Sequence, residues 1–320
     1  MNRNSPSRWG IFLLFVAVAV GGCAQRAPYG VADLPGGMPD RLELTGVPFF
    51  PQQPYQCGPA SLATVLNATG LQVSPEKIAE EIFTPAKKGS FQVLMVGAVR
   101  HYGRVPYIVG DFDSLLEEVA AGNPVVVLQN LGLNWFPKWH YAVVVGYDLQ
   151  ERILILRSGK NPRRIKPWSL FYHTWKRARN WAMVVLPPDK IPSSATEGDY
   201  LRSVTALEEI GRYEEAAVAY GAALKRWPSS LVAAMGLGNS LYAAGRMPEA
   251  EEAFRTAIQI APESGDAYNN LALALTGQNR FDEAEAAALE AIRLGGANRS
   301  SYRKTLEEIR ARDTKGSRQD

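Results

Sequence analysis

The residues best suited to chemistry in this chain are one cysteine and one histidine that lie far apart in the sequence. Cys57 follows the segment Pro51-Gln-Gln-Pro-Tyr-Gln56 and precedes Gly58 and a predicted helix over residues 60–69. The thiolate is the nucleophilic form of cysteine, and the N-terminus of a helix favours that anion. We therefore predict that Cys57 is a nucleophile for acyl transfer, with Gly58 allowing a substrate to approach the backbone closely.

A cysteine nucleophile needs a base, and the chain contains three histidines. His140 opens an apolar, β-branched segment, His140–Tyr147, which predicts a buried strand that would hold the imidazole rigidly. His101 and His173 lie beside basic residues and are typical of surface positions. We predict that His140 is the base, although a histidine at a strand end, taken alone, is as often structural.

Acyl transfer also produces an oxyanion that needs hydrogen-bond donors. The backbone N–H of Cys57 and an upstream glutamine side chain could supply two of them. Gln52 and Gln53 are both candidates, and we favour Gln52. We expect no cofactor, because the sequence contains no zinc-type cysteine cluster, Walker loop or dinucleotide-binding fingerprint.

A third residue should orient the imidazole ring. A hairpin folded about Leu149 would place Ser158 opposite His140, where the hydroxyl could accept a hydrogen bond from the ring. Ser158 cannot stabilise an imidazolium as an anion would. Asp148 is the nearest carboxylate along the strand, but it lies about 26 Å away if the strand is straight.

The N-terminus has the features of a lipoprotein signal. A basic start and an apolar run over residues 9–20 lead to two glycines and Cys23, which predicts a signal peptide over 1–22 and lipidation of Cys23. An ordinary secretory signal is the alternative. Ala24 is not the aspartate that usually signals inner-membrane retention, so we expect an outer-membrane anchor facing the periplasm. Cys57 would then be an unpaired thiol in an oxidising compartment, which is tolerated when it is buried or when its reactivity is used.

Composition and local signals divide the rest of the chain into two domains. Its 320 residues are 46% hydrophobic and 21% charged, with a net charge of +3, which is ordinary for a globular protein and gives no reason to expect nucleic-acid binding. An order of helices first and an antiparallel sheet afterwards predicts an α+β domain. The predicted parts are a tether over 23–44, the α+β domain over 45–188, a linker over 189–198, a helical domain over 199–312 and a tail over 313–320.

Periodicity and turn signals predict the elements of the α+β domain. The expected helices cover residues 60–69, 75–83, 91–102 and 113–121. The expected strands cover residues 47–50, 105–109, 124–128, 140–147, 152–157 and 181–186.

The helical domain contains a repeat of 34 residues, which is the length of the tetratricopeptide repeat. In each copy a Gly or Asn ends the first helix and small alanines let the paired helices approach closely. Residues 199–312 resemble three such repeats with a capping helix over 300–312, and a generic alanine-rich bundle is the alternative. The aligned segments are Gly211–Ala216, Gly245–Ala250 and Asn279–Ala284.

The two chemical motifs of the first domain resemble the C39-like branch of the papain-like cysteine peptidases. The resemblance covers roughly residues 45–188 and implies a Cys57 nucleophile, a His140 base and Gln52 as the oxyanion donor. The family usually has an aspartate on the strand after the histidine, where this chain has Arg157-Ser158. Its glutamine is usually one residue further from the cysteine. Better-known members are fused to a transporter and cut leader peptides after a double glycine, but no transporter segment is present, so that substrate does not follow.

Two functions from different classes fit these features. The first is a membrane-anchored cysteine peptidase whose catalytic residues are Cys57, His140, Gln52 and Ser158. Its repeats would bind a protein partner or substrate, and this binding would either recruit the substrate or inhibit the enzyme. The second is a non-catalytic lipoprotein adaptor that uses the peptidase-like fold and the repeats for envelope assembly, which the missing carboxylate favours.

Overall fold

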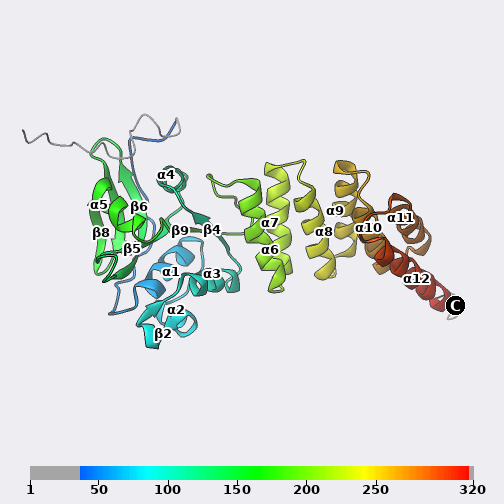
Figure 1. Cartoon of the computed structure of the whole chain (residues 1–320), viewed down its shortest axis with the longest axis horizontal. Coiled ribbons are helices and arrows are strands. Elements are labelled where there is room, and N and C mark those ends of the chain that lie inside the picture. The colour runs from blue at the N-terminus through cyan, green and yellow to red at the C-terminus, as the bar shows by residue number, and fades with distance from the viewer. Residues whose placement is uncertain (1–36, 317–320) are drawn as a thin grey trace, which may run out of the picture. The chain divides into compact units, whose positions relative to one another are not determined.

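The computed structural model describes residues 37–316 (Figure 1). The predicted signal peptide, Cys23 and most of the predicted tether lie outside the described residues. The described chain begins with an α+β domain and continues as a series of paired helices, as the sequence predicted. Within residues 37–316, none of the helices has the length and apolar character to cross a membrane.

The first domain is built on a seven-stranded antiparallel sheet. The strands follow the order β4-β9-β5-β6-β7-β8, and β1 pairs with the far end of β6. The central strands β5, β6 and β9 have long buried apolar runs, as expected of a sheet covered on both faces. The strands are β1 (Arg41–Glu43), β4 (Val105–Val109), β5 (Val125–Asn130), β6 (Trp139–Asp148), β7 (Ile153–Ser158), β8 (Asn161–Pro167) and β9 (Ala182–Leu186).

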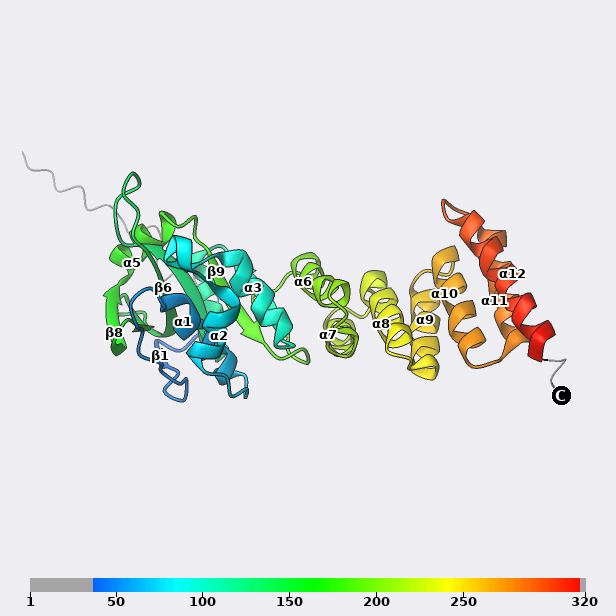
Figure 2. The same cartoon turned by 90° about the horizontal axis from the view of Figure 1, so that it is seen from below.

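Helices cover this sheet. Helix α1 packs its apolar residues against one face, where Leu62 and Leu66 share a core with Val143 and Val145 of β6, and Figures 1 and 2 show α1 lying against the sheet. A short hairpin, β2 (Phe83–Thr84) and β3 (Gly89–Ser90), follows α2. The helices are α1 (Cys57–Ala68), α2 (Pro75–Ile82), α3 (Gln92–His101), α4 (Phe112–Ala120) and α5 (Trp168–Lys176).

The predicted strand over 47–50 was wrong. Pro48 and Pro51 lack a backbone N–H, which disfavours pairing in a sheet. This segment instead crosses the end of the sheet through single contacts: the Arg157 side chain donates to the carbonyl of Val47 at 3.1 Å, and the Gln52 N–H donates to the carbonyl of Gly159 at 2.9 Å. The segment therefore leads to Cys57 while contacting the hairpin that follows His140.

Besides the short hairpin of β2 and β3, three larger elements were not predicted. Strand β1 lies inside the predicted tether and pairs with Gly146–Asp148 of β6. Strand β8 is exposed at all but one of its residues and rich in Arg and Lys, as suits an edge strand, and therefore lacks an apolar pattern. Helix α5 follows it directly and buries Trp168, Phe171 and Trp175.

The linker is packed against the first domain. The Glu118 carboxylate is fully buried and accepts hydrogen bonds from the backbone N–H of Ser194 at 2.7 Å and from its hydroxyl at 2.6 Å. The Tyr107 hydroxyl donates to the carbonyl of Ser194 at 3.4 Å. These contacts fix residues 194–196 before the first repeat helix begins.

The repeats form three helix pairs and a final helix. Gly211, Gly245 and Asn279 have φ values of 77°, 79° and 60°, so each repeat ends its first helix in the left-handed conformation that the sequence predicted. The helices are α6 (Glu197–Glu209), α7 (Tyr213–Arg226), α8 (Leu231–Ala243), α9 (Met247–Ile260), α10 (Gly265–Gly277), α11 (Phe281–Leu294) and α12 (Arg299–Gly316).

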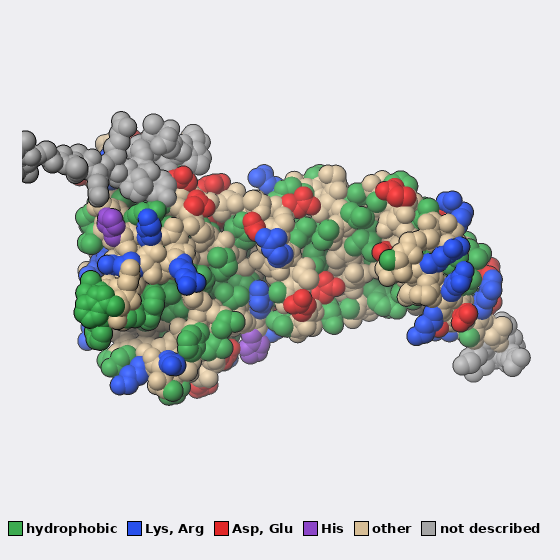
Figure 3. Space-filling view, in the orientation of Figure 1, with side chains coloured by type: hydrophobic (Ala, Val, Ile, Leu, Met, Phe, Trp, Pro, Cys, Tyr) green, Lys and Arg blue, Asp and Glu red, His purple; other side chains and the backbone are tan. Residues whose placement is uncertain are grey.

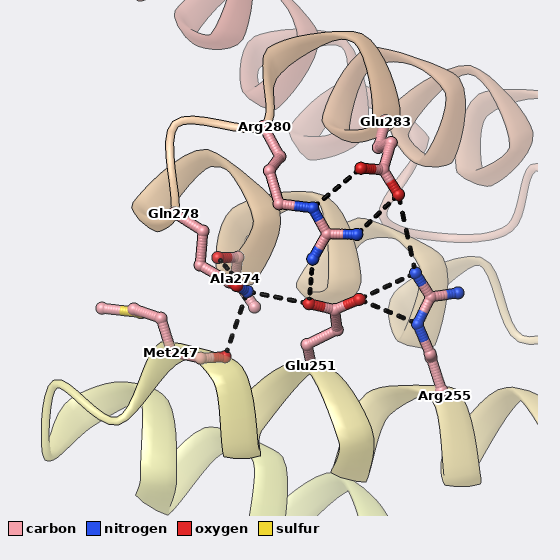
Figure 4. Close-up of polar contacts among 7 residues, drawn as sticks. All are labelled: Met247, Glu251, Arg255, Ala274, Gln278, Arg280 and Glu283. Carbon is pink, nitrogen blue, oxygen red and sulfur yellow. Dashed lines mark hydrogen bonds and ion pairs between the residues drawn. The ribbon is translucent and has the colours of Figure 1, made fainter.

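A buried carboxylate links the second and third repeats (Figure 4). Glu251 of α9 accepts hydrogen bonds from Arg255 at 2.8 Å, from Gln278 at 2.9 Å and from Arg280 at 2.5 Å. Burial acts to raise the pKa of Glu251, but these hydrogen bonds outweigh burial and leave the pKa below its ordinary value. The side chain is therefore an anion that joins α9 to the turn between α10 and α11.

Close packing inside the repeats gives a prediction about stability. A Cβ added to Gly238 would overlap the ring of Phe254, whereas one added to Gly221 would meet no atom within 4 Å. We expect Gly238→Ala to lower the free energy of unfolding by about 1–3 kcal/mol. The matched change Gly221→Ala should raise it by about 0.5–1 kcal/mol, because alanine is the better helix former. Urea unfolding followed by circular dichroism measures both, and equal effects would contradict this packing.

Candidate active site

Cys57 is the first residue of α1, three residues earlier than the helix start that the sequence predicted. Gln56 is the N-cap residue, and its side chain makes no capping hydrogen bond. Cys57 is half-buried, and the backbone groups of Tyr141, Gly58 and Cys57 itself act to lower the pKa of its thiol. The thiol therefore lies over the first turn of α1 and against β6.

Burial dominates the ionisation of this thiol. Desolvation raises the pKa of Cys57 above its ordinary value of 9.0, and the backbone hydrogen bonds lower it by less. The sequence suggested a thiolate stabilised by the helix N-terminus, so this expectation was wrong for the resting protein. The reason is that removing a thiolate from water costs more than the backbone groups return.

His140 is the second residue of β6 and directly precedes Tyr141, whose backbone contacts the thiol. Its Nε2 lies 2.9 Å from the hydroxyl oxygen of Ser158. If Nε2–H donates to that oxygen, Nδ1 is the basic nitrogen of the ring. His140 thus directly precedes the β6 residue that packs with α1, and Ser158 orients one of its ring nitrogens.

The surroundings of His140 are basic. Burial, followed by the charges of Lys166, Arg164 and Lys138, lowers the pKa of His140 to about 4. Among the described residues, no carboxylate bonds to the ring. At neutral pH the resting pair is therefore a thiol and a neutral imidazole.

Ser158 reaches His140 by a different register from the one predicted. A bulge between Val144 and Gly146 shifts the β6–β7 pairing, so that Val143 lies opposite Arg157. In that register Ser158 falls opposite Ala142 and meets His140 diagonally, which is within reach of neighbouring strands. The predicted contact between the two residues is present, although the predicted pairing was wrong.

Gln52 is the glutamine that enters the site, whereas Gln53 is exposed. The Gln52 side-chain amide donates to the carbonyl of Tyr141 at 3.2 Å and to the hydroxyl of Ser61 at 3.4 Å. Its oxygen accepts from the N–H of Gly159 at 3.0 Å. In the resting protein Gln52 therefore links α1, β6 and the turn after β7, through two donor contacts that are long and easily exchanged.

Other residues are excluded from this site or were missed. Asp148 lies at the far end of β6 and accepts from two backbone N–H groups of the following turn, as expected. His101 contacts Glu81 at 2.9 Å, away from Cys57. Tyr141 was missed as a site residue: its hydroxyl donates to the carbonyl of Ser90 at 3.2 Å, and its position directly after His140 was the available signal.

These ionisation states predict how alkylation of the free protein depends on pH. The pKa of Cys57 lies above 9.0 and that of His140 is about 4, so neither group titrates between about pH 5 and 8. The thiolate fraction should rise about tenfold with each pH unit up to the thiol pKa. We expect the rate of Cys57 alkylation by iodoacetamide to rise in this way from about pH 6 to 9. A plateau across neutral pH would instead indicate a preformed thiolate–imidazolium pair.

Two parts of the chain match models of known families. Residues 44–183 match the model of the Peptidase_C39 like family, and residues 201–265 and 241–309 match two tetratricopeptide repeat models. No curated protein matches the chain.

Several solved structures are similar to one part of the chain or the other. A putative C39-like peptidase from Bacillus anthracis has 21% identity and a TM-score of 0.40, covering 45% of this chain and 96% of its own. The translocator chaperone SycD from Yersinia enterocolitica has 19% identity and a TM-score of 0.36, covering 39% of this chain and 90% of its own. The Sgt2 tetratricopeptide domain from Aspergillus fumigatus has 20% identity and a TM-score of 0.35, covering 38% of this chain and 82% of its own. Residues 44–183 are thus similar to the Peptidase_C39 like family, and residues 201–309 are similar to tetratricopeptide repeats.

Proposed function

We propose that the first domain is a cysteine peptidase, or a related thiol acyl-transfer enzyme, with Cys57 as nucleophile and His140 as base. The observation that supports this most is the position of Cys57, which packs against the core that contains Tyr141, the residue next to His140. Ser158 holds Nε2 of the same histidine at 2.9 Å. In this proposal Cys57 is the nucleophile, His140 the base and Ser158 the residue that orients the imidazole.

The reaction would begin with attack of the Cys57 sulfur on a peptide carbonyl carbon while the thiol proton passes to Nδ1 of His140. The oxyanion would be stabilised by the backbone N–H of Cys57 and by the Gln52 amide, once that amide leaves the carbonyl of Tyr141. As the C–N bond breaks, the His140 proton moves to the leaving amine. Water then attacks the thioester, His140 takes its proton, and the acid is released with the thiol restored.

The basic surroundings of His140 determine the timing of the first step. An imidazolium would be destabilised by Lys138, Arg164 and Lys166, and Ser158 offers no negative charge to offset them. Proton transfer therefore accompanies attack, because the negative charge that develops on the substrate is then present to stabilise the cation. This makes substrate binding part of the activation of Cys57.

The repeats have a separate role in this proposal. Solenoids of this kind present extended surfaces to peptides and partner proteins, so residues 199–312 recruit a protein partner or substrate to the enzyme. Lipidation of Cys23 places the protein at the outer membrane, facing the periplasm. Incorporation of a radioactive fatty acid, with loss of the label in Cys23→Ala, tests the anchor independently of catalysis.

The peptidase activity is tested by the N-termini that the protein creates. Envelope extract is incubated with the wild-type protein or with Cys57→Ala, and new N-termini are identified by mass spectrometry. We expect a set of cleavages that appears only with the wild-type protein. Equal sets from both proteins would contradict the proposal.

A non-catalytic adaptor is the second candidate. It is favoured because the partner of His140 is the neutral hydroxyl of Ser158 and not a carboxylate. An adaptor needs the repeats but not the thiol. If cells with Cys57→Ala behave like wild type while deletion of residues 199–312 gives a phenotype, the adaptor is correct. If Cys57→Ala reproduces the phenotype of a complete deletion, the enzyme is correct.

A further inference from the structure

The loop that leads into His140 exposes large apolar side chains. Trp135 is 81% exposed, Phe136 is 73% exposed and Trp139, which directly precedes His140, is 53% exposed. Monomeric soluble proteins rarely expose contiguous apolar groups of this size without an interaction to make. In Figure 3 hydrophobic side chains gather at the left end of the molecule, beside a shaded hollow.

This loop is a hairpin with defined backbone hydrogen bonds, which we call the aromatic hairpin (residues 130–139). The Asn130 side chain accepts from the N–H of Gly132 at 3.0 Å and from the N–H of Lys138 at 2.9 Å. Leu133 and Phe136 exchange backbone hydrogen bonds of 3.1 and 3.2 Å. A Cβ on Gly132 would overlap the carbonyl of Phe136. The aromatic side chains are therefore presented from a closely packed backbone, which lowers the entropic cost of binding.

Exposed apolar residues also occur in two other segments near Cys57. Phe91 and Val93 follow Ser90, and a Cβ on Gly58 would lie 2.8 Å from the Ser90 side chain. Tyr55 precedes Cys57 by two residues, and its ring lies 5.6 Å from the ammonium of Lys88. Three segments that adjoin the site thus expose apolar groups around Cys57.

We propose that the aromatic hairpin is a substrate-binding subsite that takes large apolar side chains of an extended peptide, an inference that rests on the proposed function. Trp139 and Tyr141 are two residues apart on β6 and share one face of the strand, and the backbone of Tyr141 contacts the thiol. A peptide whose scissile carbonyl reaches Cys57 therefore passes along the hairpin. The exposed apolar groups belong to three separate segments that adjoin Cys57 or His140, which favours a bound peptide over a membrane surface, because a membrane would need one protruding patch.

Two active-site probes test this inference. They are tripeptidyl acyloxymethyl ketones that differ only in their first two residues, Phe-Leu in one and Ser-Gln in the other. In both, the Cys57 thiolate displaces the carboxylate, so that a C–S bond forms and a C–O bond breaks. We expect the second-order inactivation rate of the wild-type protein to favour the apolar probe by about tenfold or more.

The variant Trp135→Ala/Phe136→Ala should reduce that preference to about twofold or less while leaving the iodoacetamide rate unchanged. The matched control Ile108→Ala/Leu170→Ala removes exposed apolar groups elsewhere in the domain, 46% and 53% exposed, and should keep the preference. An unchanged preference in the hairpin variant overturns the inference. The inference is also overturned if the hairpin variant loses binding to phosphatidylglycerol vesicles while its preference for the apolar probe is unchanged. That result would mean that the hairpin binds a membrane. If neither probe labels Cys57 although iodoacetamide does, the proposed function itself fails.

Discussion

Replacing His140 with alanine is expected to slow peptide hydrolysis by about a thousandfold, the usual scale for loss of a general base. The same change should leave alkylation of Cys57 at about pH 9 within roughly threefold of wild type. The two effects differ because the resting thiol is not ionised by the imidazole: burial lowers the pKa of His140 to about 4 and raises that of the thiol. Turnover of a quenched fluorescent peptide and the iodoacetamide rate measure them.

His173→Ala is the matched control, because His173 is exposed on α5. It should change neither rate. If His140→Ala instead abolishes alkylation at high pH while hydrolysis persists, His140 supports the fold around the thiol and is not the base. If both rates stay at the wild-type level, His140 has no part in the chemistry.

Introducing a carboxylate at position 158 is expected to increase the reactivity of Cys57 at neutral pH. Ser158 is buried and bonds Nε2 of His140, so Ser158→Asp would place an anion against the imidazole. An adjacent opposite charge raises the pKa of the histidine from about 4 toward its ordinary 6.5. A higher histidine pKa enlarges the thiolate–imidazolium fraction, and we expect alkylation at about pH 7 to become about tenfold faster or more.

Ser158→Asn separates charge from shape. Asparagine has almost the same size as aspartate and also accepts a hydrogen bond, but it cannot stabilise a cation. It should leave the alkylation rate at about pH 7 within roughly twofold of wild type. Equal acceleration by both variants would mean that loosening the site, rather than charge, controls the thiol.

Much of the fold follows from local signals in the sequence. Ser74 caps α2 ahead of Pro75, and the glycines and asparagine of the repeats adopt left-handed backbone where the period of 34 predicts them. The buried strand that begins near His140 is visible as an apolar run. These features depend on residue type and spacing alone, which is why they could be predicted.

The remainder depends on three-dimensional context. Strand β8 is polar because it lies at an edge, and the bulge between Val144 and Gly146 leaves no clear mark in the sequence. The sequence identified the residues Cys57, His140 and Ser158 but misjudged the ionisation of the thiol. Of the three cations near His140, Lys138 is a neighbour in the sequence, but Arg164 and Lys166 come from β8. Their combined effect with burial requires a structure.

The most direct test of the account is to look for the acyl-enzyme. The protein is mixed with the p-nitrophenyl ester of an acetylated Phe-Leu dipeptide, quenched in acid, digested and mapped by mass spectrometry. We expect the acyl group on Cys57 as a thioester in the wild-type protein, and neither this adduct nor catalysed release of p-nitrophenol in Cys57→Ala. Catalysed release that persists in Cys57→Ala, or a wild-type protein that is never acylated at Cys57, would contradict the account.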